Sequence, residues 1–128
     1  MPDGVLSRQG AWEAQPSLSV IVCNCFEGFH AWAEAPEEVA FLRSRHRHLF
    51  TVQTTIHTDH HNRAVEFFLL QRRIEQVIAL LRGRESDYEQ WSCERWATMI
   101  GEQLRHEALP VTRVEVWEDN ENAGVAQW

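Results

Sequence analysis

The chain has 128 residues, 44% of them hydrophobic, which is typical of a single domain with its own core. Nineteen acidic and 12 basic residues give a formal net charge of -7, which disfavours nucleic acid as a partner. No apolar run approaches the roughly 20 residues that a membrane-spanning helix needs. The sequence shows no secretory signal and has three cysteines, an odd number. We therefore expect a cytoplasmic protein with reduced thiols that binds neither nucleic acid nor membranes.

The first part of the chain predicts an arm, a strand and a connection. Residues 1–17 contain several prolines and glycines without periodicity, so we expect a loose arm followed by one domain over 18–128. Residues 18–26 (LSVIVCNCF) are β-branched and apolar, as in a strand, and His30 lies at or beyond its end. Residues 31–44 contain a proline and predict a connection.

A second strand is predicted over residues 46–57 (HRHLFTVQTTIH). His46, His48 and Phe50 fall on one face because side chains alternate along a strand. Residues 59–62 (DHHN) then favour a turn.

The second half predicts two helices and two more strands. An apolar stripe at spacings of three and four predicts a helix over 66–82, capped by Gly83, and residues 83–91 are polar and expected to be exposed. Ser92 is expected to cap a second helix that stops before Pro110.

The C-terminal segment completes the predicted sheet. Residues 111–118 alternate as a strand, 119–124 favour a turn, and 125–128 predict a short final strand. Two strands, two helices and two strands predict an α+β domain, in which two helices cover one face of a four-stranded antiparallel sheet.

Three histidines are candidate metal ligands. His46 and His48 point the same way and lie roughly 6.6 Å apart along the strand, so both imidazoles can reach one metal ion. His30 is the best third ligand, because a neighbouring strand would place it across from the pair. A zinc site with an open fourth position would result. The alternative is that these histidines are solvated or hydrogen-bonded locally.

Several segments, taken in order, resemble the family of 6-pyruvoyltetrahydropterin and 6-carboxytetrahydropterin synthases. Residues 26–30 (FEGFH) and 46–48 (HRH) match the Phe-x-x-x-His and His-x-His ligand motifs of that family. Residues 64–67 (AVEF) and 92–97 (SCERWA) resemble the entries to its two helices. Residues 114–118 (VEVWE) resemble its terminal Val-x-Val-x-Glu strand.

The resemblance implies the tunnelling fold, with protomers joined into rings, and we expect a homo-oligomer, preferably a hexamer. It implies a zinc-dependent lyase acting on 7,8-dihydroneopterin triphosphate or a related reduced pterin, towards tetrahydropterins or 7-deazaguanines such as queuosine. Zn²⁺ would be held by His30, His46 and His48. Glu118 would anchor the amidine edge of the pterin ring, with Glu94 as a second substrate-binding residue. A carboxylate suits that edge because it accepts two parallel N–H bonds.

The sequence departs from the family where catalysis is expected. The family has a cysteine or glutamate shortly before His-x-His, but residues 40–45 (AFLRSR) contain neither. The family's Asp-His pair after the first helix is also missing. Weak replacements as general acid or base are Glu38, Asp87 and the turn residues Asp59 and His60, and without one a factor of about 10² to 10⁴ in rate is lost.

Two alternatives to an enzyme therefore stay open. The chain could be a non-catalytic oligomer that binds a pterin or purine and keeps zinc and Glu118, or a structural oligomer without metal. Arg43, Arg45 and Arg47 flank the candidate ligands. They could neutralise a triphosphate, or be solvated residues beside a strand.

Overall fold

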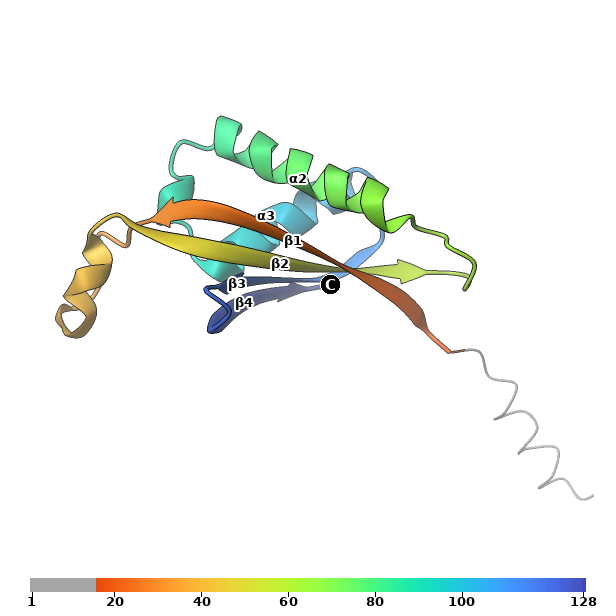
Figure 1. Cartoon of the computed structure of the whole chain (residues 1–128), viewed down its shortest axis with the longest axis horizontal. Coiled ribbons are helices and arrows are strands. Elements are labelled where there is room, and N and C mark those ends of the chain that lie inside the picture. The colour runs from red at the N-terminus through yellow and green to blue at the C-terminus, as the bar shows by residue number, and fades with distance from the viewer. Residues whose placement is uncertain (1–15) are drawn as a thin grey trace, which may run out of the picture.

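The computed structural model describes residues 16–128, so that residues 1–15, and with them nearly all of the predicted loose arm, lie outside the described residues. An antiparallel four-stranded sheet, in the order β1-β2-β3-β4, carries both long helices on one face (Figure 1). The predicted α+β class is confirmed. The elements are β1 (Leu18–His30), the 3-10 segment η1 (Glu37–Arg43), β2 (His46–Thr58), α2 (Phe67–Arg84), η2 (Tyr88–Gln90), α3 (Cys93–His106), β3 (Val111–Glu118) and β4 (Asn122–Gln127).

The core lies between the sheet and the two helices. Along β2, alternate residues from Phe50 to Thr58 are buried, as the period of two predicts. They meet the apolar stripe of α2, which includes Ile74, and that of α3, which includes Trp96. Both of these helix side chains are almost fully buried. Within residues 16–128, no helix is long and apolar enough to cross a membrane.

The helix termini show where local sequence signals were sufficient. Ser92 caps α3 as predicted, its hydroxyl oxygen accepting the backbone N–H of Arg95 at 3.1 Å. The prediction that Gly83 caps the preceding helix is wrong, because α2 continues to Arg84 and Gly83 has no positive φ. At the end of α2 the backbone N–H of Glu85 instead donates a hydrogen bond to the carbonyl of Leu81.

The burial of one segment and the start of one strand differ from prediction. Residues 83–91 are not uniformly exposed, because Trp91 is only 2% exposed and its ring centroid lies 4.8 Å from that of Trp96. Strand β4 begins at Asn122 rather than 125, because Asp119 and Asn120 adopt positive φ in a tight turn and Glu121 N–H bonds the Glu118 carbonyl at 3.0 Å. Two consecutive positive φ values are the geometry of a type I′ hairpin turn.

Candidate metal centre

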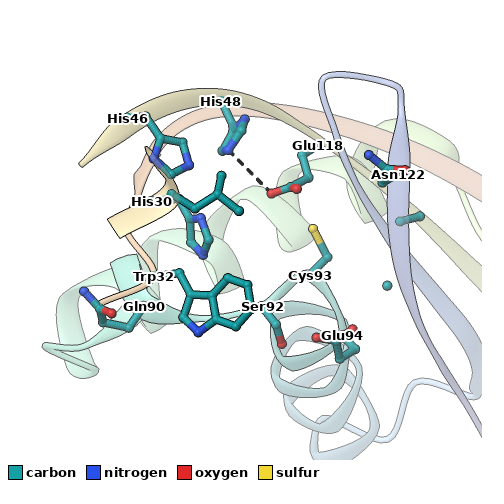
Figure 2. A pocket seen from close by; sticks show the side chains of 13 residues that line it. His30, Trp32, His46, His48, Gln90, Ser92, Cys93, Glu94, Glu118 and Asn122 are labelled. Atoms are coloured by element: carbon teal, nitrogen blue, oxygen red, sulfur yellow. Dashed lines mark ion pairs between the residues drawn. The ribbon is translucent and has the colours of Figure 1, made fainter. Parts of the chain in front are cut away.

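Three histidines converge where β1 ends and β2 begins. His30 is the last residue of β1 and lies directly opposite His46 in the antiparallel register, while His48 follows two residues later on the same face. The ring centroids are 5.3 Å apart for His30 and His46, 5.9 Å for His30 and His48, and 4.6 Å for His46 and His48. Their candidate ligand atoms all lie within 4.8 Å of one another (Figure 2). The predicted trio is therefore brought together and could hold a metal ion.

Ring nitrogens in this cluster are available for coordination. Among the described residues, His30 Nδ1 and His46 Nε2 are buried nitrogens without a hydrogen-bond partner. His46 Nδ1 lies 2.6 Å from the carbonyl oxygen of Ser44 and donates to it, which leaves a lone pair on Nε2. Burial lowers the pKa of His30, an effect reinforced by His46 and His48 and opposed by Glu118. The neutral imidazole, which is the form that binds metal, is therefore favoured.

Asp119 fixes the orientation of His48. Its Oδ2 lies 2.5 Å from His48 Nδ1, and its Oδ1 accepts the backbone N–H of Leu49 at 2.8 Å. The hydrogen bond with His48 and then that with Leu49 lower the pKa of Asp119. A proton held on Nδ1 leaves Nε2 of His48 free, the arrangement in which an outer carboxylate orients a metal-binding histidine.

The histidines form one side of a cavity of about 470 Å³. The opposite side comes from the start of α3 and the β3–β4 hairpin (Figure 2). We call this space the histidine cavity, and its lining is His30, Trp32, Leu42, His46, His48, Gln90, Ser92, Cys93, Glu94, Glu118, Asn122, Ala123 and Gly124.

Both predicted substrate-binding residues face the histidine cavity. Glu118 ends β3, and its Oε2 lies 3.6 Å from His48 Nε2. Its side chain is 30% exposed, so it is partly withdrawn from water. Glu94 lies in the first turn of α3. This arrangement sets the Glu118 carboxylate beside the candidate metal ligands, while Glu94 is an exposed residue on the opposite side of the cavity.

Cys93 is a cavity residue that the sequence did not indicate as part of the site. It lies in the cavity lining together with Glu118 and Gly124. Burial, and then the negative charges of Glu118 and Glu94, raise the pKa of Cys93 to about 12. The thiol therefore stays protonated at neutral pH and is a poor nucleophile.

The start of α3 and strand β4 approach each other closely at the histidine cavity. A Cβ placed on Gly124 of β4 would lie 2.1 Å from the backbone nitrogen of Glu94. Only glycine allows the hairpin to approach the start of α3 so closely.

The four weak acid or base candidates lie elsewhere. His60 and Asp59 are beyond the far end of β2, roughly 40 Å along the strand from His46, with His60 Nε2 3.8 Å from Asp59 Oδ1. His60 lines a second cavity, of about 370 Å³. Glu38 is on η1 outside the cavity lining, and Asp87 accepts a hydrogen bond from Trp91 Nε1 at 3.2 Å. The structure brings none of them to the histidines.

No protein-family model matches the chain, and a search of curated proteins finds no similar sequence.

Proposed function

We propose that this chain is a zinc-dependent pterin-binding protein of the 6-pyruvoyl/6-carboxy-tetrahydropterin synthase type, with the tunnelling fold. One observation carries the proposal. The histidine trio and Glu118 share a single cavity, where a ring held by the carboxylate would present its side chain to the metal. The order of two strands, two helices and two strands is compatible with this fold.

The donor set fits zinc. Three imidazoles, with no fourth ligand grouped with them in the described part of the chain, are typical of a zinc site that keeps a position open for water or substrate. The Asp119–His48 hydrogen bond supplies the outer carboxylate that such sites use. When bound, zinc acidifies water and polarises substrate oxygens.

Glu118 has the properties required of a ring anchor. Its carboxylate is partly buried, lies beside the metal ligands and lines the same cavity as the Cys93 thiol. A carboxylate accepts two parallel N–H bonds from a 2-amino-4-oxo pyrimidine edge, and this pairing selects that edge over others. Trp32, which also lines the cavity, offers a flat surface for a ring.

Zinc-assisted lyase chemistry is the leading form of the proposal. The candidates to move a proton within the cavity lining are Glu94, Glu118 and the histidines, since Cys93 stays protonated. The absence of a thiolate from the described lining favours a second candidate function, a pterin- or purine-binding protein with slow or no turnover.

A ring-shaped oligomer and a cytoplasmic location are further parts of the proposal. Strands β1 and β4 are the two edges of the sheet, and β1 is 13 residues long. A long unpaired edge favours pairing with another chain, and we prefer a hexamer. A native mass near 15.0 kDa would contradict this part.

Calorimetry with a pterin, on zinc-loaded protein, tests the proposed function. Glu118→Ala removes a charge-assisted contact, and we expect it to cost about 2 kcal/mol, or ~30-fold in affinity. Glu121→Ala is the matched control, because Glu121 is an exposed glutamate of the adjoining turn. Equal pterin affinity in both variants would remove Glu118 as the anchor. A product assay with dihydroneopterin triphosphate then separates the enzyme from the binding protein.

A further inference from the structure

We propose that Cys23 and Cys25 of β1 form a binding site for a soft monovalent metal ion, copper(I), on the face of the sheet that the helices leave open. Both thiols are free and exposed. The inference goes beyond the proposed function, because the histidine cavity lies on the helix-covered side of the sheet and takes no part in it.

The alternation of side chains along β1 puts both thiols on the open face. Val22 and Asn24 are only 3% and 6% exposed and point towards the helices. Their neighbours Cys23 and Cys25 therefore point the other way. His30 is an even number of positions from Val22, so the sheet itself separates the cysteine pair from the histidine trio. An assembly joined at the sheet edges pairs backbone groups and leaves the side chains of the open face in place.

The spacing of the cysteine pair suits a shared metal ion better than a disulfide. Two positions along a strand span roughly 6.6 Å, whereas the Cβ atoms of a disulfide lie only about 3.5 to 4.5 Å apart. Two metal–sulfur bonds, at about 2.3 Å each as for zinc, place their sulfurs up to roughly 4.6 Å apart. The two side chains can lean together by that amount without movement of the backbone.

Helix α2 fixes the backbone that carries the thiols. The side-chain Nε2 of Gln71 donates to the carbonyl of Cys23 at 3.0 Å, and Asn24 Nδ2 donates to the carbonyl of Gln71, also at 3.0 Å. These reciprocal bonds tie residues 23 and 24 to the helix. Ligands that are already held at a fixed spacing lose less conformational entropy when they bind an ion.

A hydroxyl group beside one sulfur can stabilise its metal-binding form. Thr51 Oγ1 lies 3.6 Å from Cys25 Sγ, across the β1–β2 pair. Thr51 also donates to Asn120 Oδ1 at 3.3 Å, so that its oxygen is left to accept the S–H of a protonated Cys25. When the thiol loses its proton, the hydroxyl can turn and donate to the thiolate. Hydrogen bonds of this kind to a charged ligand support metal sites.

The number and the softness of the ligands select the ion. Within residues 16–128, no histidine, carboxylate or third cysteine is grouped with the pair, and zinc sites ordinarily have three or four protein ligands. Thiolate sulfur is a soft ligand that favours copper(I), and two such ligands satisfy copper(I). Binding forms two Cu–S bonds and releases two thiol protons to solvent. The bound site carries one net negative charge, and no electron is transferred.

Anaerobic titration of the zinc-loaded native assembly with copper(I), in competition with a chromophoric copper(I) chelator, tests the inference. We expect one copper(I) per chain, bound with release of two protons. Cys23→Ser and Cys25→Ser should each lose more than the 10- to 100-fold in affinity that removal of an outer partner costs, because each removes a direct ligand. Both variants should keep the circular dichroism spectrum of wild type, since both thiols are exposed.

Two control variants place the copper. Cys93→Ser removes the third thiol and His46→Ala removes a ligand of the histidine trio, and both should bind copper(I) as wild type does. Thr51→Val should weaken copper binding about tenfold, and Thr51→Ser, which keeps the hydroxyl, should restore it. Equal affinity in Thr51→Val and wild type would remove Thr51 from the site.

Three results would overturn the inference: no copper uptake by wild type against the chelator, unchanged affinity in Cys25→Ser, or loss of copper from His46→Ala. One copper(I) per two chains would overturn a site within a single chain. Because His46→Ala measures copper binding without an intact histidine trio, failure of this inference and failure of the proposed function are told apart.

Discussion

Replacing Asp119 by asparagine tests how the metal site is oriented. Asparagine tolerates the positive φ of 50° at this position, so the turn is retained. Its carbonyl oxygen can still accept the Leu49 N–H, but its amide NH₂ then faces His48 Nδ1. His48 would have to accept at Nδ1 and carry its proton on Nε2, where the metal lone pair is needed.

We expect this substitution to weaken zinc binding measurably. Loss of such an outer partner typically costs 10- to 100-fold in metal affinity, or about 1.4 to 2.7 kcal/mol. The Asp119 side chain is 45% exposed, so water can partly replace it and the lower value of about tenfold is expected. Competition with a chromophoric zinc chelator at fixed pH measures the change.

The matched control is Asp59→Asn, which removes the same charge from the other Asp-His contact in the described chain. Asp59 is 84% exposed and 3.8 Å from His60, far from the histidine trio. This variant should bind zinc as wild type does. Equal zinc affinity for wild type and Asp119→Asn would refute the assigned role of Asp119.

Three further predictions concern reactivity, packing and pH. Iodoacetamide at pH 8 should modify the two exposed cysteines of β1 long before Cys93, whose pKa is raised to about 12; early alkylation of Cys93 by mass spectrometry would contradict this. Gly124→Ala should cost about 1 to 3 kcal/mol of unfolding free energy. Gly83→Ala is the control, because Gly83 is a helical position with open space around it, and it should raise the unfolding free energy by about 0.5 to 1 kcal/mol. If denaturant titrations gave the same change in unfolding free energy for both variants, the close approach of Gly124 to α3 would be excluded. Hydrogen bonds from Arg73 of α2 lower the pKa of Glu107 from 4.5. The unfolding free energy should therefore fall as the pH drops below 4.5, and this fall should be smaller in Glu107→Gln.

Periodic and local signals in the sequence predicted much of the fold. Strand β3 was predicted at its observed bounds, and Ser92 caps α3, because both depend on residues close together in the chain. The metal trio was predictable for a similar reason. A spacing of two puts His46 and His48 on one face, and neighbouring antiparallel strands bring His30 to the same end.

The remaining features depend on contacts between distant parts of the chain. Asp119 bonds a histidine 71 positions earlier, so its sequence context indicated only a turn. Cys93 acquires its environment from Glu118 and Gly124 on two other strands. Trp91 follows a polar segment, yet it is buried by packing on Trp96. The tunnelling fold, the oligomer and the pterin ligand stay predictions.

Zinc stoichiometry tests the central claim most directly. Wild type, His46→Ala and His57→Ala should be purified without chelator, supplied with zinc, dialysed and analysed for metal and protein. His57 is the matched control because it lies on the same strand, β2, but is exposed on the opposite face. The account predicts one zinc per chain in wild type and His57→Ala, and a large loss in His46→Ala. No zinc in wild type, or full retention in His46→Ala, would contradict it.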